Sequence, residues 1–299
     1  MNLADKKLLV IGLGLIGGSL AMAARQAHAV SRVSGYDRNE ESLKTAIQMG
    51  VIDQAESDLI TAVNSADIIF LAVPILSTRS ILSLIQPHLK EGAVVTDAGS
   101  TKGIVVSDAR RVLSTEQLSN FIPGHPIAGA ECSGVEASNP ALYVNHRIIL
   151  TPIEETSTAA LTLITDLWKA VGSEVDIMSV DHHDDVLAAT SHLPHLLAFN
   201  LVDTLAKNSE NREIFNYAAG GFRDFTRIAG SDPIMWHDIF MANRQSVLKV
   251  MDQYLDELHL LRNAVAHADG EYMKSVFTHA KESREYFTQL LSDRNSKHK

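Results

Sequence analysis

The stretch LLVIGLGLIGGSLA, residues 8–21, decides the fold. An apolar run of strand length leads directly into Gly12, Gly14 and Gly17, spaced G-x-G-x-x-G, and then into a helix-forming segment. Between a strand and a helix, such glycines allow a tight turn, a close approach of backbone to a pyrophosphate, and close packing of the helix on the strand. The stretch therefore predicts a dinucleotide site at the N-terminus of the helix, with a merely structural glycine turn as the alternative.

An acidic residue follows at the distance that a dinucleotide site requires. Asp37 ends the next apolar run, 20 residues after Gly17, where a carboxylate accepts hydrogen bonds from the adenosine ribose. A carboxylate there repels a 2′-phosphate, so Asp37 favours NAD over NADP. The neighbouring Arg38 leaves NADP open, because a guanidinium at this place can pair with such a phosphate.

The chain divides into two parts with different periodicity. Within residues 1–178, continuous apolar runs alternate with segments of helical length, which predicts a doubly wound α/β Rossmann domain with a parallel sheet buried on both faces. Residues 179–299 are helical in pattern and predict an all-helical domain for substrate binding and dimerisation. The predicted strands lie in LLVIGLG, RVSGYD, DIIFLAVP, GAVVTDAG, NFIPGHP, HRIILTP and SEVDIMS.

Two segments of the helical part carry further signals. Residues 185–206 are apolar nearly all round, which predicts a helix buried in the core of a homodimer. After SDP at 231–233, where Ser231 or Asp232 can cap a helix and Pro233 fits its first turn, apolar residues recur at steps of three and four. This pattern predicts one long helix that breaks near Gly270, followed by a last amphipathic helix.

The composition limits the classes of partner. The chain has 299 residues, 45% of them hydrophobic, and a net charge of −10 without clusters of Lys and Arg. This balance predicts a globular protein with a sizeable core and argues against nucleic acid or an anionic membrane surface as a partner. The single Cys132 and an N-terminus without an export signal indicate a reducing, cytoplasmic location.

A histidine stands between two backbone-restricting residues in GHPIAGA, residues 124–130. We expect His125 to follow a strand of the parallel sheet and so to lie at its carboxyl edge, near a nicotinamide. An imidazole suits the acceptance of a hydroxyl proton near neutral pH, whereas a histidine that only binds backbone in a turn is the alternative. Ser100, in DAGSTK, is expected to face the same crevice, although Ser100 and Thr101 can also cap the next helix.

The helical part supplies a second histidine cluster. In SHLPH, His192 and His195 are three residues apart and share a helix face, and Pro194 should kink the helix. Metal ligation by this pair is the less favoured interpretation, because no third ligand has matching spacing. The acidic segment DHHDD at 181–185 is interpreted as the solvated start of a helix, which the helix dipole explains.

Two arginines lie four residues apart in GGFRDFTRIAGSDPIMW, residues 220–236. A planar guanidinium in an apolar, glycine-flanked segment is suited to bidentate binding of a carboxylate. We interpret Arg227 as a ligand-binding residue. For Arg223 we favour a structural salt bridge with Asp224.

These motifs together give the chain a close resemblance to the prephenate dehydrogenase family, which includes arogenate and cyclohexadienyl variants. The resemblance rests on GLGLIGGSLA, DAGSTK, GHPIAGAE, SHLPHLLAFNLVD and GGFRDFTRIAGSDPIMW, and it covers nearly the whole chain in the same order. It implies NAD-dependent oxidative decarboxylation of prephenate to 4-hydroxyphenylpyruvate in tyrosine synthesis, by a Rossmann domain followed by a helical dimerisation domain. It implies no metal.

The resemblance also implies roles for individual residues. His125 would accept a hydrogen bond from the ring hydroxyl and assist its deprotonation, while Ser100 would contact the same hydroxyl and orient the histidine. Arg227 would bind a substrate carboxylate and His195 would line the pocket, with His192 and Trp236 as neighbours. Cys132 departs from the family pattern, in which many relatives carry a lysine.

Three alternatives remain open from the sequence. Arogenate, with its side-chain ammonium, is the alternative substrate, for which Asp224 or Asp232 could supply a carboxylate. A β-hydroxyacid dehydrogenase would need a catalytic lysine that the helical part does not offer at a suitable place. A non-catalytic NAD-binding regulator would keep the glycines and Asp37 but would not need His125 or Arg227.

Overall fold

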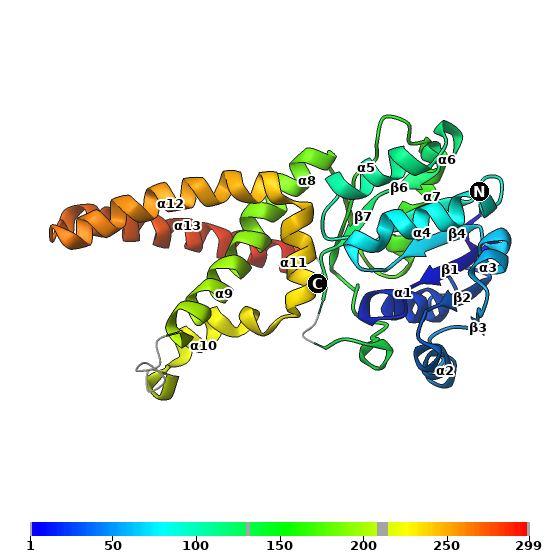
Figure 1. The fold of residues 1–299 in the computed structure, drawn as a ribbon, viewed down its shortest axis with the longest axis horizontal. Helices are drawn as coiled ribbons and strands as arrows, with labels where there is room; N and C mark the ends of the chain where they lie inside the picture. The colour runs from blue at the N-terminus through cyan, green and yellow to red at the C-terminus, as the bar shows by residue number, and fades with distance from the viewer. Residues whose placement is uncertain (1, 130–131, 208–214, 298–299) are drawn as a thin grey trace. The chain divides into compact units, whose positions relative to one another are not determined.

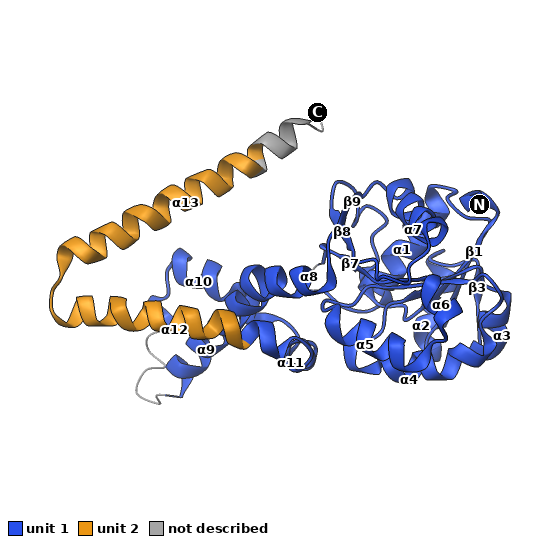
Figure 2. Cartoon of the chain, turned by 90° about the horizontal axis from the view of Figure 1, so that it is seen from above, with its two compact units in different colours: residues 1–247 blue, residues 248–299 orange. Residues whose placement is uncertain are grey.

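The computed structural model describes residues 2–129, 132–207 and 215–297. The chain forms two compact units, residues 1–247 and 248–299, which are coloured separately in Figure 2. All the predicted site residues belong to the first unit. Among the described residues, no helix is both long and apolar enough to cross a membrane.

The first unit contains a six-stranded parallel sheet in the order β3-β2-β1-β4-β5-β6 (Figure 1). This strand order is that of a Rossmann domain, in which the order reverses between β1 and β4 and the ligand crevice lies at the carboxyl ends of the strands. The predicted α/β fold class is confirmed. The strands are β1 (Lys7–Ile11), β2 (Arg32–Tyr36), β3 (Gln54–Ala55), β4 (Ile68–Leu71), β5 (Val94–Asp97) and β6 (Phe121–Ile122).

Helices cover both faces of this sheet. Along β1, Leu8 and Val10 pack into one apolar cluster, whereas Leu9 and Ile11 pack into another on the opposite face. Both faces are therefore buried, which explains why the apolar runs of the sequence are continuous. In Figure 2, α1 and α7 lie on one side of the sheet and α4 and α5 on the other. The helices are α1 (Leu15–Gln26), α2 (Glu40–Gln48), α3 (Leu59–Ser65), α4 (Thr78–Ile85), α5 (Gly103–Val112), α6 (Thr115–Ser119) and α7 (Thr158–Ala170).

A second, three-stranded sheet accounts for the last predicted strands. It consists of β7 (Gly124–Pro126), antiparallel to β8 (Arg147–Leu150), which is parallel to β9 (Glu174–Ile177). The segment NFIPGHP therefore supplies two strands, with Pro123 between β6 and β7. His125 follows β6 of the large sheet, as predicted, but it lies within β7 and pairs with Ile149 of β8, so the expectation that it lies in a loop is wrong.

The helical part of the first unit begins with α8 (Val180–Leu187) and α9 (Leu193–Ala206), joined by a π-helical turn at Ala188–His192. Pro194 lacks the N–H that would bond to the Thr190 carbonyl, and the widened turn lies at the place where this bond would form. Only Leu193 and Ala198 of α9 are buried within the single chain. Most of the predicted buried helix is thus only partly covered by its own chain.

The segment after SDP contains two helices instead of one. Asp232 caps α11 (Pro233–Ala242) by accepting hydrogen bonds from the N–H groups of Ile234 and Met235, and Pro233 occupies the first turn as predicted. The chain interrupts the helix at Asn243, and α12 (Arg244–Ala266) begins after it. In the second unit α13 (Gly270–Lys297) begins at Gly270, which confirms the predicted break. Upstream of α11 lie the short α10 (Gly220–Thr226) and a 3-10 turn at Arg227–Gly230.

Candidate active site

The glycine loop between β1 and α1 has the geometry of a dinucleotide site. Gly12 has a φ of 96°, and a Cβ there would overlap the Ala72 carbonyl after β4. A Cβ at Gly17 would overlap the Gly12 carbonyl, so this glycine serves the packing of α1 on the loop. In contrast, a Cβ at Gly14 would meet nothing within 4 Å. Gly14 is the N-cap of α1, so the open space lies where helix N–H groups favour a phosphate.

Asp37 connects the end of β2 to this glycine loop. Its Oδ2 accepts a hydrogen bond from the Leu13 N–H at 2.8 Å, and its Oδ1 accepts one from the Asn39 N–H at 2.9 Å. Each carboxylate oxygen has a further lone pair, and the half-buried side chain can therefore also accept a ribose hydroxyl. Together with the open Gly14, this carboxylate fits the adenosine half of a dinucleotide. Arg38 is exposed beside it.

His125 lies at the same edge of the large sheet as the glycine loop. Asp97 ends β5, opposite Leu71 at the end of β4, and its Oδ1 accepts a hydrogen bond from the N–H of Gly124 at 3.1 Å. The carboxyl edge of the large sheet thus holds the start of β7 in place. His125 therefore lies near the crevice as expected, but a strand of the second sheet holds it there.

A buried ion pair fixes the backbone next to His125. Lys102 is fully buried, and its Nζ donates to Asp97 Oδ2 and, at 2.6 Å, to the carbonyl oxygen of Gly124. Burial lowers the pKa of Lys102, although Asp97 opposes this effect. Neither residue was predicted from the sequence, although Asp97 and Lys102 frame the DAGSTK motif. The available signal was a carboxylate and an ammonium five residues apart at the end of a predicted strand.

A second histidine contacts His125. The His125 Nδ1 lies 2.9 Å from Nε2 of His183, and His183 Nδ1 lies 2.8 Å from Oδ1 of Asp184. Burial, together with the neighbouring His183, Lys102 and His192, holds the pKa of His125 well below its usual value. His125 is therefore neutral near pH 7 and available as a proton acceptor.

The interpretation of DHHDD as a solvated helix start holds for Asp181, His182 and Asp185 but is wrong for His183 and Asp184. His183 is fully buried and Asp184 is 7% exposed, whereas Asp181, His182 and Asp185 are exposed. His183 and Asp184 lie four residues before the buried Leu187 and Ala188, so all four share the inward face of α8. That spacing was the signal in the sequence, and the helix dipole explains only the exposed residues.

Ser100 lies half-buried in the loop between β5 and α5, on the chain that leads from Asp97 to Lys102. Neither Ser100 nor Thr101 caps α5, whose N-cap position is Lys102. Instead, the carboxylate of Asp184 accepts hydrogen bonds from the N–H groups of Lys102, at 2.7 Å, and Gly103, at 2.8 Å. The cap of α5 therefore comes from α8.

His192 and His195 lie against Trp236 of α11. The rings of His195 and Trp236 are stacked with centroids 3.7 Å apart, and the ring of His192 meets Trp236 edge-on at 6.0 Å. Asn243 Nδ2 lies 3.2 Å from His192 Nδ1 and donates to the Asp184 carbonyl at 2.8 Å, which ties this cluster to α8. Burial lowers the pKa of His192 to about 4.

The two arginines of GGFRDFTRIAG differ in their surroundings. Arg223 lies 3.9 Å from Asp224, and both side chains are at least 80% exposed, so the favoured surface salt bridge is confirmed. Arg227 is also exposed, but its charge contributes to lowering the pKa of His195, after burial. The charge of Arg227 therefore acts on His195 of the histidine and tryptophan cluster.

A Rossmann sheet with an open glycine at a helix N-terminus, and a neutral histidine at the same edge, defines a dinucleotide-dependent dehydrogenase. The family described as prephenate dehydrogenase, nucleotide-binding domain, matches residues 20–177, and its dimerization domain matches residues 179–279. The chain belongs to the prephenate dehydrogenase family, which confirms the resemblance seen in the sequence.

Individual relatives agree with this assignment. Cyclohexadienyl dehydrogenase of Zymomonas mobilis is 36% identical over 93% of this chain and 95% of its own length. Prephenate dehydrogenase of Bacillus subtilis is 37% identical over 95% of this chain and 77% of its own length. The crystal structure of prephenate dehydrogenase from Aquifex aeolicus in complex with hydroxyphenyl propionate and NAD⁺ is 39% identical, has a TM-score of 0.88, and covers 94% of this chain and 98% of its own.

Proposed function

We propose that this chain catalyses the NAD-dependent oxidative decarboxylation of prephenate to 4-hydroxyphenylpyruvate, a step of tyrosine synthesis. One observation carries the proposal: in a chain of this family, the neutral His125 is anchored at the sheet edge that also bears the open glycine loop. A merely regulatory NAD-binding protein would have no need of a histidine held in this way.

NAD is the cofactor, and when bound it supplies the acceptor for the hydride that leaves the substrate ring. Gly12, Gly14 and Gly17 would hold its pyrophosphate, and Asp37 would accept hydrogen bonds from its adenosine ribose. The fit rests on the open space at Gly14 and on the half-buried carboxylate of Asp37. NADP is the second candidate, because the exposed Arg38 could pair with a 2′-phosphate.

His125 is the proposed catalytic base. Removal of hydride from the ring carbon that bears the hydroxyl leaves positive charge, which loss of the ring carboxylate as carbon dioxide relieves as the ring becomes aromatic. The imidazole accepts the hydroxyl proton as the hydride leaves and returns it to the phenolate oxygen that decarboxylation produces. Ser100, on the loop before α5, is proposed to contact the same hydroxyl and to help orient His125.

The substrate is proposed to lie between the sheet edge and the helical part. Arg227 is assigned to a substrate carboxylate because its guanidinium charge acts on His195 and a guanidinium binds a carboxylate bidentately. His195, His192 and Trp236 are assigned to the walls of the pocket, since their rings form one contiguous aromatic group. The enzyme then works mainly by positioning, with no step that requires a metal.

An assay of NADH and NADPH formation with prephenate and with arogenate, each against NAD and NADP, tests the function. We expect turnover with prephenate and NAD. Arogenate is the second candidate substrate, because a relative of 36% identity over nearly its whole length is a cyclohexadienyl dehydrogenase. A clear preference for arogenate would replace the first choice, and the absence of turnover with either substrate would overturn the proposed activity.

We also propose how the chain is organised. Residues 1–178 form the dinucleotide-binding domain, and residues 179–299 form the substrate and dimerisation domain of a homodimer. The two family matches, which meet between residues 177 and 179, support this division. A cytoplasmic location is proposed from the single cysteine and from the biosynthetic reaction, and neither nucleic acid nor a membrane is expected as a partner.

A further inference from the structure

His183 connects the proposed catalytic base to a carboxylate. Its Nε2 lies 2.9 Å from His125 Nδ1, and its Nδ1 lies 2.8 Å from Asp184 Oδ1. His183 is fully buried, so its two ring nitrogens must find their partners within the protein. Neither the proposed reaction nor the binding of substrate requires His183 or Asp184 to touch the reacting atoms.

The other hydrogen bonds of Asp184 determine its protonation state. Its carboxylate already accepts hydrogen bonds from the N–H groups of Lys102 and Gly103 at the start of α5. Burial by itself would raise the pKa of Asp184, but the hydrogen bonds from His183, Lys102 and Gly103 outweigh burial and lower it. Asp184 is therefore ionised and can only accept.

The ionised carboxylate of Asp184 determines which atom donates in the hydrogen bonds that connect Asp184, His183 and His125. Because Asp184 only accepts, His183 Nδ1 carries the proton and donates a hydrogen bond to Oδ1. A neutral imidazole has a single N–H, so His183 Nε2 is an acceptor, and burial keeps His183 neutral by lowering its pKa. His125 Nδ1 must then donate to His183 Nε2. The remaining nitrogen of His125, Nε2, is left with a free lone pair.

We propose, on the basis of the proposed function, that His183 and Asp184 are positioning residues that hold His125 in its Nδ1–H tautomer, with Nε2 as the proton acceptor. The opposite tautomer would present an N–H to the substrate hydroxyl and could not take its proton. When Nε2 receives that proton, the His125 imidazolium keeps its Nδ1–H bond to His183. The ionised Asp184 beyond His183 then stabilises the new positive charge.

The tautomer can be observed without any substrate. Long-range ¹H–¹⁵N spectra of protein labelled with ¹⁵N-histidine distinguish a protonated Nδ1 from a protonated Nε2, and the signals of His125 and His183 are assigned from their loss in His125→Gln and His183→Gln. We expect both rings to be neutral with the proton on Nδ1 near pH 7. A proton on Nε2 of His125 would overturn the proposal, whatever the enzyme's substrate is.

Kinetics provide the second test. His183→Leu should lower kcat by about 10- to 100-fold, the range seen when the hydrogen-bond partner that orients a functional histidine is lost, with the KM for NAD unchanged. His183→Gln should recover part of this loss, because its amide oxygen can accept from His125 Nδ1. The matched control is His182→Leu on the exposed side of α8, which should keep the wild-type kcat.

A double-mutant cycle separates positioning from a general structural role. If His183 acts through His125, then His183→Leu should cause no further loss of kcat in a His125→Ala background. Losses that add in the double variant would overturn the proposal, as would a wild-type kcat for His183→Leu. Failure of the wild-type chain to form NADH would instead refute the proposed function, and the tautomer measurement would still decide the role of His183.

Discussion

His195 stacks on Trp236, with ring centroids 3.7 Å apart and an angle of 24° between the ring planes. This contact joins α9 to α11 and places a histidine beside a large apolar surface, in a group that the charge of Arg227 also reaches. The sequence motifs SHLPH and GGFRDFTRIAGSDPIMW, 25 residues or more apart, thus contribute to one aromatic cluster.

Replacement of Arg227 tests the proposed carboxylate contact in this cluster. Arg227→Ala should raise the KM for prephenate by roughly 10-fold or more, because a charge-assisted hydrogen bond contributes about 1.5–3 kcal/mol. The KM for NAD should not change. Arg223→Ala is the matched control, since that side chain is 82% exposed and pairs only weakly with Asp224. Equal KM values for both variants would return Arg227 to a structural role.

Replacement of His125 tests the proposed base. His125→Ala should lower kcat by about 10²- to 10⁴-fold, the loss typical of a missing acid-base group, while the Kd for NAD measured by titration calorimetry stays near the wild-type value. Retained NAD binding distinguishes loss of the base from loss of the fold. Near-normal turnover would favour the non-catalytic interpretation of this histidine.

Two glycines of one motif should respond in opposite ways to the addition of a methyl group. Gly14→Ala should leave the Tm unchanged and weaken NAD binding, because its Cβ would occupy the open space at the start of α1. Gly17→Ala should lower the Tm, because its Cβ would overlap the Gly12 carbonyl. Thermal melts and NAD titrations of both variants check this. Unimpaired NAD binding by Gly14→Ala would contradict the proposed place of the pyrophosphate.

The buried His192 should make stability depend on pH. Burial lowers its pKa from 6.5 to about 4, so between these values the unfolded chain binds a proton that the folded chain does not. The free energy of unfolding is therefore highest above about pH 6.5 and falls as the pH drops toward 4, by about 3 kcal/mol for this group. His125 and His183, whose pKa values are also lowered, add to the same trend.

Urea unfolding at constant protein concentration, from about pH 7 down to about pH 4.5, measures this dependence. His192→Gln should fall less steeply than the wild type over this range. The exposed His182→Gln should keep the wild-type slope. Parallel curves for the wild type and His192→Gln would show that His192 does not titrate as described.

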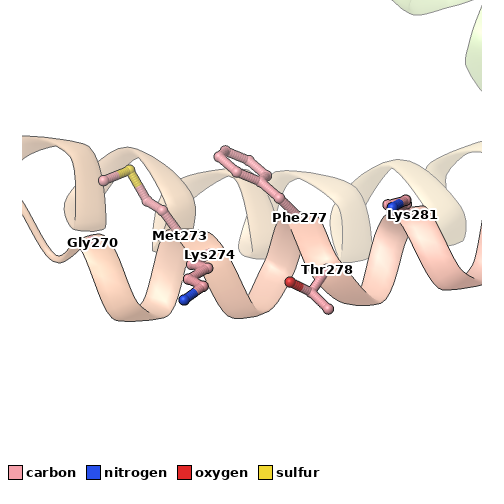
Figure 3. Close-up of a pocket in the computed structure, with 6 residues that line it drawn as sticks. All are labelled: Gly270, Met273, Lys274, Phe277, Thr278 and Lys281. Atoms are coloured by element: carbon pink, nitrogen blue, oxygen red, sulfur yellow. The ribbon is translucent and has the colours of Figure 1, made fainter.

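The apolar surfaces of the helices predict a homodimer. Most of α9 is only partly buried, and in the second unit Leu260 of α12 and Phe277 of α13 are more than half exposed. Figure 3 shows Phe277 and Met273 along a hollow on α13 that contains none of the proposed site residues. Light scattering at micromolar concentration should give twice the 32.6 kDa of one chain. A single 32.6 kDa species would exclude the dimer.

Local patterns were sufficient to predict the Rossmann sheet and the glycine loop. The glycines, Asp37 and the continuous apolar runs each depend only on the strand, turn or helix in which they lie, so they can be recognised from neighbouring residues. The assignment of β7 failed because the strand is only three residues long and follows Pro123, so no periodicity could separate it from β6. Its partner β8 lies more than 20 residues further along the chain.

The contacts around His125 could not be predicted because they join distant segments. Asp184 caps a helix that begins 81 residues earlier, and Lys102 reaches the Gly124 carbonyl across 22 residues. The inward face of α8 was readable from the spacing of His183 and Leu187. The residues that this face contacts, however, depend on how α8 packs against α5, and no local sequence pattern predicts that packing.

The π-helical turn between α8 and α9 determines the relative orientation of two sets of side chains. A turn that holds one additional residue rotates everything after it by about 100° around the helix axis, compared with an uninterrupted α-helix. Deletion of one residue from 188–191 would leave His183 and Asp184 in place on α8 but turn the rings of His192 and His195 away from Trp236. The orientation of His192 and His195 relative to the proposed base His125 thus depends on one additional residue in this turn.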